Sequence, residues 1–289
     1  MAAARIGDLA WLALFRLRAR LDRRFGVPAG LDSPEPGTAS AGDGPALPRR
    51  LWLYWEQGWD EAPELVRRCR RPWERHHPGW EIACLDGESA KALVPREAWE
   101  PRAGMRANHK ANLLRLHLLA GQGGVWADST TFCAEPLEAW LPPFMGSGFF
   151  ALARPGPDRL LSTWLLAAVP RHALVEKWLA ASLRYWRLTA KADFYFWLPY
   201  LFADLCRRDP AARAAWAAVP RVGADPSHAV QRHSADIGAT ERIEALLAAG
   251  TVPVHKLDWR LPLPDAGART PLARLLERLD EDGEGREGG

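Results

Sequence analysis

The sequence predicts an α/β fold with a mostly parallel central sheet flanked by helices. Strand-like and helix-like patterns alternate early in the chain, with a strand at 51–55, a helix at 62–77, a strand at 80–85 and a helix from about 105 to 120. Gly123-Gly124 ends that last helix, and a short apolar strand follows it. Such β-α-β-α-β alternation is typical of parallel strands joined by helices that cover both faces of the sheet.

The first 30 residues are predicted to form a basic amphipathic helix. Ala10, Leu14, Leu17 and Leu21 recur at helical spacing, and five arginines lie between positions 16 and 24. Such a stripe either packs on the body of the protein or lies on an anionic membrane surface, and the sequence leaves both possibilities open. No segment reaches the roughly 18 uninterrupted apolar residues that a membrane-spanning helix needs.

Residues 31–48 are rich in Pro, Gly, Ser and Ala and predict a flexible linker, so we expect one folded domain at 49–279. The acidic, glycine-rich tail at 280–289 is expected to be disordered. The second half of the domain is expected to be mainly helical. Its expected elements are a strand at 149–153, helices at 160–169, 173–186, 194–206 with a kink at Pro199, 241–249 capped by Thr240, and 270–279, and a strand at 251–257.

The composition is typical of a globular protein that does not bind nucleic acid. The chain has 289 residues, a formal net charge of +3 and no basic run with interleaved aromatic residues. Its four cysteines are far apart and form no C-x-x-C motif, which disfavours a zinc site and a disulfide framework. They fit a reducing cytoplasm, which is the localisation that we expect.

Asp128, which follows the apolar strand, is the most informative single residue. In open α/β sheets the carboxyl ends of the strands form the edge at which ligands bind. A carboxylate at that edge, with the hydroxyl groups of Ser129 and Thr130 beside it, suits a divalent cation bound to a diphosphate. The alternative is that Asp128 only forms a turn or caps a helix.

Three further residues indicate nucleotide-sugar chemistry. Asn112 and Arg115 lie three positions apart on one predicted helix and therefore share a face. The fork of an arginine matches phosphate oxygens, and an asparagine can bond to a sugar hydroxyl. Trp55 ends the first strand and offers an aromatic plane to a base. The alternatives are a solvated helix face for Asn112 and Arg115, and core packing for Trp55.

Competing motifs are missing from the sequence. The glycine-rich segment at 121–124 follows a helix rather than a strand, so it does not form a dinucleotide-binding loop. The chain has no Walker A, G-x-S-x-G or H-E-x-x-H motif. The pattern around Asp128 therefore favours a glycosyltransferase that uses a nucleotide sugar.

Several ordered motifs resemble the bacterial capsular polysaccharide synthesis protein family. That family is similar to sugar transferases with a DXD motif, including yeast outer-chain mannosyltransferases and clostridial glucosylating toxins. The resemblance implies a GT-A-like single domain, a nucleotide-activated sugar as donor, and Mn²⁺ or Mg²⁺ as cofactor. The matching segments lie within about 49–259 and are 51–59, 112–119, 123–132, 148–155, 194–202 and 254–257.

The resemblance also implies roles for individual residues. Trp55 matches the aromatic residue that stacks on the base. Asn112 matches an acid that contacts the sugar and ribose, and Arg115 matches its partner. Asp128 and Thr130 match the two ends of the DXD motif. Asp128 and Arg115 would therefore be catalytic, and Asp128 and Thr130 would hold the metal.

Two residues in the C-terminal part are implied to lie near the diphosphate. His255 would be a further metal ligand, and Lys256 would bind the nucleotide sugar. The sequence also departs from the family pattern at two positions, because Asn112 and Thr130 each replace an acid. Asn112 keeps an oxygen but loses the charge, and a neutral hydrogen bond contributes about 0.5–1.5 kcal/mol against about 1.5–3 for a charged one. The missing second acid is expected to weaken metal binding more, but the capsular family itself tolerates a small residue and Thr after the first Asp, so the resemblance still implies an enzyme.

We therefore expect a glycosyltransferase, hexosyltransferase-like and by resemblance retaining, that acts on a capsular or related cell-surface polysaccharide or on a lipid-linked glycan. Its expected partners are the donor, the acceptor and, through the N-terminal helix, the inner face of the membrane. Two alternatives remain open. One is a non-catalytic component of a polysaccharide assembly system that binds a nucleotide sugar or glycan. The other is an unrelated α/β enzyme with a metal–phosphate site, such as a nucleotidyltransferase.

Overall fold

The structure is a computed structural model that describes residues 6–32, 46–265 and 267–284, with side chains up to residue 278. Its centre is a six-stranded sheet in the order β2-β1-β3-β6-β5-β7. β1 is parallel to β2 and β3, β6 is antiparallel to β3 and β5, and β7 is parallel to β5. The strands are β1 Arg50–Tyr54, β2 Glu81–Leu85, β3 Gly124–Ala127, β5 Phe149–Gly156, β6 Arg159–Ala168 and β7 Val222–Gly223.

Both faces of this sheet are covered, as β1 illustrates. Trp52 and Tyr54 pack into the core on one side, whereas Leu51 and Leu53 pack into the core on the other. Successive side chains of a strand point to opposite faces, so a strand between two helical layers must be apolar throughout. The apolar run of β1 follows from this position.

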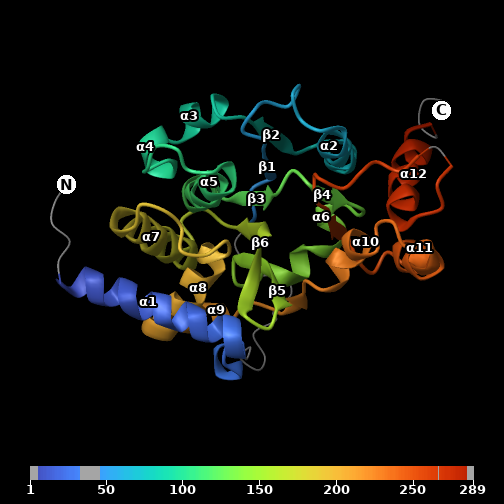
Figure 1. Cartoon of the computed structure of the whole chain (residues 1–289). Coiled ribbons are helices and arrows are strands. Elements are labelled where there is room, and N and C mark those ends of the chain that lie inside the picture. The colour runs from blue at the N-terminus through green and yellow to red at the C-terminus, as the bar shows by residue number, and fades with distance from the viewer. Residues whose placement is uncertain (1–5, 33–45, 266, 285–289) are drawn as a thin grey trace.

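The two layers that enclose the sheet differ in character (Figure 1). One consists of long helices, and the other combines shorter helices with a two-stranded antiparallel sheet of β4 Thr131–Cys133 and β8 Val254–Lys256. The first layer contains α1 Ile6–Phe25, α3 Ser89–Leu93, α4 Arg96–Trp99, α5 Ala107–Gln122, α7 Ala173–Leu188, α8 Trp197–Arg208 and α9 Pro210–Ala217, and the second contains α2 Glu64–His76, α6 Leu137–Trp140, α10 Ala229–Arg232, α11 Thr240–Ala248 and α12 Pro271–Glu284.

The prediction of an α/β fold with a mostly parallel sheet between helices is confirmed. The helix expected at 160–169 is wrong, because these residues form β6, which pairs with β3 and β5. β6 is buried on both faces, and a continuous apolar run does not distinguish a central strand from a buried helix. The Pro155-Gly156-Pro157-Asp158 segment before it closes the β5–β6 hairpin and was the overlooked turn signal.

Three smaller expectations also need correction. Pro199 is the third residue of α8, where its missing N–H removes no helical hydrogen bond and requires no kink. The hydroxyl of Thr240 does not cap α11 but donates to the carbonyl of Arg269 at 2.9 Å. α12 continues to Glu284, into the tail expected to be disordered. The remainder of that tail, and residues 33–45 of the expected linker, lie outside the described residues.

One face of α1 packs on the body of the protein, and another face is exposed to solvent. Trp11 and Phe15 are buried, and the indole N–H of Trp11 donates to Asp204 of α8 at 3.1 Å. On its outer side Leu14, Leu17 and Leu21 are 42%, 51% and 47% exposed. Within the described residues, α1 and the other helices are all too short or too polar to cross a membrane. The predicted stripe of Ala10, Leu14, Leu17 and Leu21 therefore does not pack on the body, because all four residues are exposed and a different face of α1 makes that contact.

Two glycines set the position of β3. Gly123 ends α5 with a φ of +67°, and Gly124 begins β3 with a φ of +93°. A Cβ atom on Gly124 would lie 2.5 Å from the carbonyl oxygen of Arg50, in the neighbouring strand β1. The close approach of the two backbones therefore requires glycine at this position.

We expect Gly124→Ala to lower the free energy of unfolding by about 2 kcal/mol or more, because the new side chain is strained at this φ and meets the backbone of β1. Chemical denaturation measures the change. Gly121→Ala is the matched control, since its Cβ meets nothing within 4 Å in α5, and alanine there is expected to stabilise by about 0.5–1 kcal/mol. Equal stabilities for the two variants would show that Gly124 is not required.

Candidate active site

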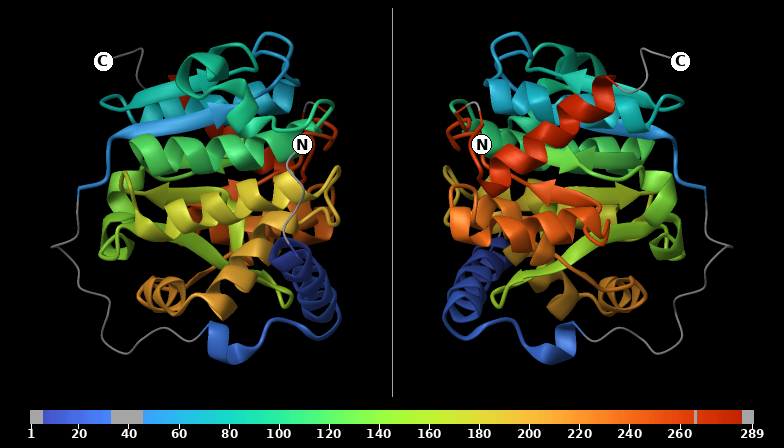
Figure 2. Two further views of the ribbon diagram at one scale, coloured as in Figure 1. Left: turned by 90° about the vertical axis from the view of Figure 1, so that its left-hand side faces the viewer. Right: turned by 90° about the vertical axis from the view of Figure 1, so that its right-hand side faces the viewer.

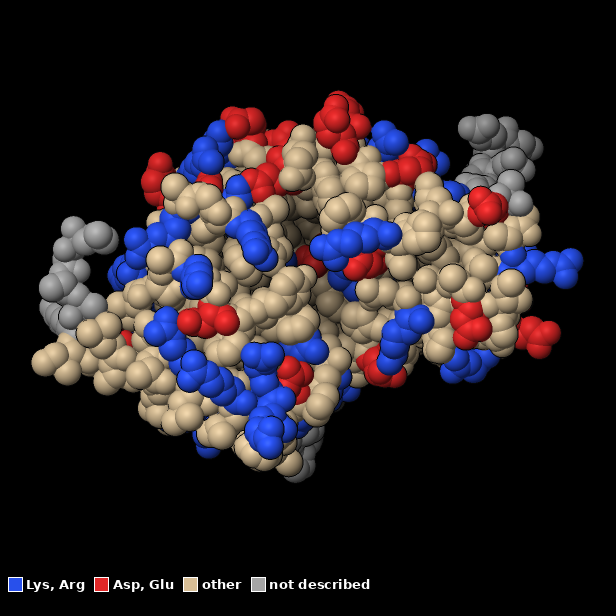
Figure 3. Space-filling view, in the orientation of Figure 1, with Lys and Arg blue, Asp and Glu red and all other residues tan. Residues whose placement is uncertain are grey.

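The carboxyl edge of the sheet brings Trp55 and Asp128 to the same side of the molecule. β1 and β3 are parallel, with Trp52 level with Trp126, so Trp55 and Asp128 leave the sheet at the same edge. The backbone turns after Asp128, where the N–H of Thr131 donates to the Asp128 carbonyl at 2.8 Å. The hydroxyl of Ser129 donates to the carbonyl of Tyr54 and ties this turn to β1. Figure 3 shows that this face is hollowed near its centre, with acidic atoms inside the hollow and basic side chains around it.

Asp128 is held by three groups. Its Oδ1 atom lies 3.0 Å from the Arg115 guanidinium and accepts a hydrogen bond of 3.0 Å from the indole of Trp126. Its backbone N–H donates to the carbonyl of Trp164 in β6 at 2.7 Å. The side chain of Asp128 is nevertheless 31% exposed, so its carboxylate is both fixed and accessible to solvent.

Arg115, in contrast to Asp128, is almost completely buried. Its side chain is 4% exposed, and its guanidinium donates to the carbonyls of Ala111 and Thr163 and lies 4.9 Å from the ring centroid of Trp126. Burial lowers the pKa of Arg115, and the charge of Asp128 opposes that shift. The expected direct contact with phosphate does not fit this burial, so we regard Arg115 as a residue that positions Asp128.

Lys256 reaches the same turn from the far end of the chain. β8 pairs with β4 so that Lys256 lies opposite Thr131, and the Lys256 ammonium donates to the Thr130 hydroxyl and to the carbonyl of Leu257. Burial lowers the pKa of Lys256, and the negative charge of Asp128 is the largest effect that opposes it. The structure therefore brings Asp128, Thr130 and Lys256 together, as the resemblance implied.

His255 is not part of this group, and the expectation that it binds a metal is corrected. Neighbouring residues of a strand face opposite ways, and His255 lies opposite Phe132, with ring centroids 6.5 Å apart. The ring of His255 is fully buried, and this burial lowers its pKa to about 4. The alternation of β8 thus allows only one of His255 and Lys256 to face the Asp128 turn.

The rim of the site contains aromatic side chains that the sequence pattern did not indicate. Trp259, 46% exposed, lies edge-on to Trp55 with ring centroids 6.2 Å apart. Tyr195, 68% exposed, comes close enough to Arg115 for an electrostatic interaction between the two side chains. Asn112 lies one turn before Arg115 on α5 and is 9% exposed. Its proposed contact with a sugar stays a prediction.

An ion pair also joins the start of α5 to the segment that follows β1. The ammonium of Lys110 pairs with the carboxylate of Glu56, which follows Trp55, and lies 3.7 Å from Glu100. Lys110 is 7% exposed, so this contact is well protected from water. The helix that carries Asn112 and the loop that carries Trp55 are therefore held in a fixed relation.

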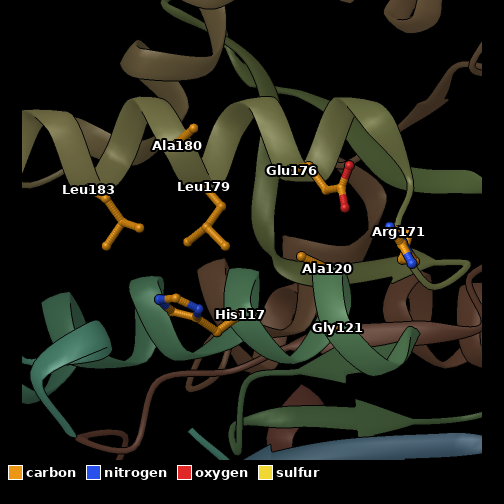
Figure 4. A pocket seen from close by; sticks show the side chains of 8 residues that line it. All are labelled: His117, Ala120, Gly121, Arg171, Glu176, Leu179, Ala180 and Leu183. Atoms are coloured by element: carbon orange, nitrogen blue, oxygen red, sulfur yellow. The ribbon is translucent and has the colours of Figure 1, made fainter. Parts of the chain in front are cut away.

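A second hollow lies between α5 and α7, away from these residues. It is an open groove of about 580 Å³. Figure 4 shows Leu179 and Leu183 of α7 pointing toward α5, from which His117 points back, with Glu176 and Arg171 at one end. Its lining contains none of the residues gathered around Asp128. We therefore place the candidate site at the sheet edge.

The residues around Asp128 do not fit a divalent cation. One oxygen of Asp128 is already engaged by Arg115, and the Thr130 hydroxyl accepts from the Lys256 ammonium. A dication on Thr130 would approach that ammonium to about 4 Å, where unit charges near a protein surface interact by about 4 kcal/mol and a double charge by about twice that. The part of the chain that the structure describes contains no group of three or more His, Cys, Asp and Glu residues that could hold a metal ion.

Comparison with known proteins identifies the family of this chain. Residues 40–272 match the model of the capsular polysaccharide synthesis protein family. The chain belongs to this family. The match includes Trp55, Asn112, Asp128 and Lys256.

Curated proteins to which the chain is similar carry glycosyltransferase names. The chain is 25% identical over 165 residues to the O-glycosyltransferase PaGT of Phomopsis amygdali, covering 50% of this chain and 40% of that protein. It is 24% identical over 146 residues to an initiation-specific alpha-1,6-mannosyltransferase of Schizosaccharomyces pombe, covering 43% and 37%. The matches thus span less than half the length of these relatives. Among solved structures, the glycosyltransferase GlyE of Streptococcus pneumoniae TIGR4 aligns with a TM-score of 0.46 and 12% identity, over 81% of this chain and 60% of that one.

The contact between Arg115 and Asp128 leads to a prediction about stability. We expect Asp128→Asn to lower the free energy of unfolding by about 1–3 kcal/mol, because the buried guanidinium loses its counter-charge while the partial exposure of position 128 limits the cost. Denaturant unfolding measures the change. The control is Glu74→Gln, which affects a 42% exposed carboxylate paired at 2.6 Å with Arg70 within α2 and is expected to change stability by less than about 0.5 kcal/mol. An Asp128→Asn variant as stable as the control would contradict the positioning role of Arg115.

Proposed function

We propose that this protein is a glycosyltransferase that moves a hexosyl group from a nucleotide sugar to a hydroxyl group of a cell-surface polysaccharide or a lipid-linked glycan. The observation that carries the proposal is that Trp55 and Asp128 follow parallel neighbouring strands at one edge of the sheet, while Lys256 contacts the turn after Asp128 through Thr130. An aromatic plane, a fixed carboxylate and an ammonium group match the base, the sugar and the diphosphate of such a donor. The family and the names of the relatives support the same activity.

The reaction breaks the bond between the anomeric carbon and a diphosphate oxygen. A bond then forms from that carbon to the acceptor oxygen, and the acceptor hydroxyl transfers its proton to the departing diphosphate or to water. The transition state resembles an oxocarbenium ion, with negative charge growing on the diphosphate. Fixed positive groups aimed at that diphosphate lower the barrier, because they interact more strongly with the transition state than with the bound donor.

Each site residue would have a separate role in this reaction. Trp55 and Trp259 would hold the base, and Asn112 would bond to a hydroxyl of the ribose or sugar. Asp128 would face the sugar from the floor of the hollow, and Lys256 would meet the diphosphate. Retention of the anomeric configuration is implied by the family resemblance and belongs to this proposal. The Mn²⁺ or Mg²⁺ implied by the same resemblance does not fit the donor set around Asp128.

A non-catalytic binding role is the second candidate, and the replacement of two family acids by Asn112 and Thr130 favours it. Both candidates predict binding of a nucleotide sugar, but only the enzyme releases nucleoside diphosphate and forms a new glycoside. A thermal-shift screen with UDP-, GDP-, dTDP- and CMP-sugars identifies the donor, since a ligand at about 100 times its Kd adds about 2.7 kcal/mol of stability. Product analysis with that donor and a lipid-linked glycan acceptor then separates the two candidates. Binding without any turnover would leave only the second.

The role of Trp55 gives a direct test of the donor site. We expect Trp55→Ala to weaken nucleotide binding about 5-fold to 100-fold, since stacking of a base on an aromatic side chain contributes about 1–3 kcal/mol. Isothermal titration calorimetry measures the affinity, and Trp55→Phe should recover most of it. Trp80→Ala is the control, because partly exposed Trp80 precedes β2 at the opposite edge of the sheet. A Trp55→Ala protein that unfolds, or that binds nucleotide like the control, would mean that Trp55 is a packing residue.

We also propose that the outer face of α1 contacts the inner surface of the membrane, where lipid-linked acceptors are found. Its exposed leucines at 14, 17 and 21 lie beside the exposed arginines Arg20 and Arg24, a combination that suits anionic lipid. Figure 2 shows α1 on the side of the molecule toward which β1 runs, which is also the side of the hollow. Binding through α1 would therefore bring the site near the lipid surface.

Leu17→Glu with Leu21→Glu tests this contact without uncovering the packed face of α1. We expect at least about a tenfold loss of binding to phosphatidylglycerol vesicles, because burial of each leucine contributes about 1.5–3 kcal/mol. Vesicle co-sedimentation measures it, with phosphatidylcholine vesicles for comparison. Ile237→Glu with Leu263→Glu, which changes two exposed apolar side chains elsewhere, is the matched control. If both double variants bind alike, α1 is not the membrane-binding element.

A further inference from the structure

An ammonium group lies at the place where the DXD pattern leads one to expect a metal ion. Thr130 corresponds to the second acid of that pattern, and its hydroxyl accepts a hydrogen bond from the Lys256 ammonium. Asp128, the remaining acid, contributes the largest charge interaction that favours protonated Lys256. The carboxylate and the hydroxyl of the turn thus already have a cation beside them.

The fold holds this cation firmly. The β4–β8 ladder places Lys256 opposite Thr131, and the N–H of Leu257 donates to the carbonyl of Thr130 at 2.9 Å. The ammonium itself donates to the Leu257 carbonyl at 2.7 Å, in addition to its contact with Thr130. A lysine has three N–H donors, so one remains for a ligand beyond these two partners among the described residues. Such a preorganised donor costs little reorganisation when a charged ligand arrives.

The charges around the turn favour an anion. Arg115 and Lys256 each interact electrostatically with the carboxylate of Asp128, and the carboxylate of Asp258 also acts on Lys256. Asp128 pairs directly with buried Arg115, so the Lys256 ammonium, with its remaining N–H, is the positive group available to a ligand. A diphosphate is attracted to such a group, whereas a divalent cation is repelled by it.

The identity of residue 130 agrees with this arrangement. An aspartate there would form an ion pair with Lys256 and would cancel the charge that faces the ligand. Threonine orients the ammonium through a neutral acceptor and leaves its charge intact. The loss of the second acid and the presence of Lys256 are thus two parts of one site.

We propose that Lys256 is the fixed cation that binds the diphosphate of the donor and stabilises it as it departs, in place of a divalent metal ion. The proposal rests on the proposed function. Lys256 would donate its remaining N–H to a diphosphate oxygen, while Asp128 and Thr130 hold the ammonium in position. Nucleotide binding and transfer would then not require added metal.

The first test uses the unmodified protein. Titration calorimetry with UDP and with GDP is carried out in EDTA and in Mn²⁺, and Mn²⁺ is also titrated alone. We expect the Kd of the diphosphate that binds to agree within about twofold between the two conditions, and no saturable heat from Mn²⁺ alone. Transfer assays with the identified donor should show the same independence of metal.

The second test removes the cation. Lys256→Met keeps the length of the side chain, and loss of a charged hydrogen bond should weaken diphosphate binding about 10-fold to 100-fold. Binding of the nucleosides uridine or guanosine, which have no phosphate, should not change. Lys91→Met is the matched control, since it removes a partly exposed lysine of α3 that pairs with Glu88. Lys256→Arg should retain most of the diphosphate affinity in EDTA.

The outcomes separate this inference from the proposed function. Diphosphate binding that appears or rises more than about tenfold with Mn²⁺ would overturn the role of Lys256 as the substitute cation and would leave the glycosyltransferase proposal in place. Normal diphosphate affinity in Lys256→Met would do the same. If neither UDP nor GDP nor any nucleotide sugar binds under either condition, the proposed function falls, and this inference falls with it.

Discussion

The candidate site depends on the buried ion pair between Arg115 and Asp128. The guanidinium lies between α5 and the sheet, 4% exposed, where an uncompensated charge would be strongly destabilising. The guanidinium donates hydrogen bonds to the carbonyls of Ala111 and Thr163 and contacts the face of the Trp126 ring. Of these four partners, only Asp128 supplies a counter-charge. The direction of the Asp128 carboxylate is therefore set by packing between a helix and the sheet. A loop alone would leave it free to turn toward solvent.

The second constraint acts over a long stretch of chain, because 126 positions separate Thr130 from Lys256. The two-stranded β4–β8 sheet joins them, and its alternation directs Lys256 to the turn and His255 into a core with Phe132. A shift of the ladder by one residue would exchange the two side chains and replace a cation at the site by an imidazole. The chemistry of the turn thus depends on strand register as much as on residue type.

The sequence was sufficient for the parts of the structure that depend on local patterns. The two glycines after α5, the apolar β3 and the carboxylate that follows it predicted the position of Asp128, and the strand at β1 predicted that of Trp55. The side of β8 that faces the site was not predictable, since it follows from pairing with a distant strand. Trp259 was missed because it lies in an irregular segment, where no periodicity distinguishes an exposed ring from a core ring. Tyr195 was assigned to the helix predicted at 194–206, but α8 begins only at Trp197. The burial of Arg115 was missed because spacing on a helix shows which residues share a face, and not what covers that face.

The segment 160–169, for which the sequence predicted a helix, is important for the site because it forms the strand β6. β3 and β6 pair from Gly124 with Ala168 to Ala127 with Leu165, and the backbone of β6 extends beyond the last residue of β3. There the carbonyl of Thr163 accepts from Arg115, and the carbonyl of Trp164 accepts from the N–H of Asp128. In a helix these carbonyls would be used by residues four positions along the chain. Because β6 runs antiparallel to β3 and past its end, its free carbonyls hold both members of the buried ion pair.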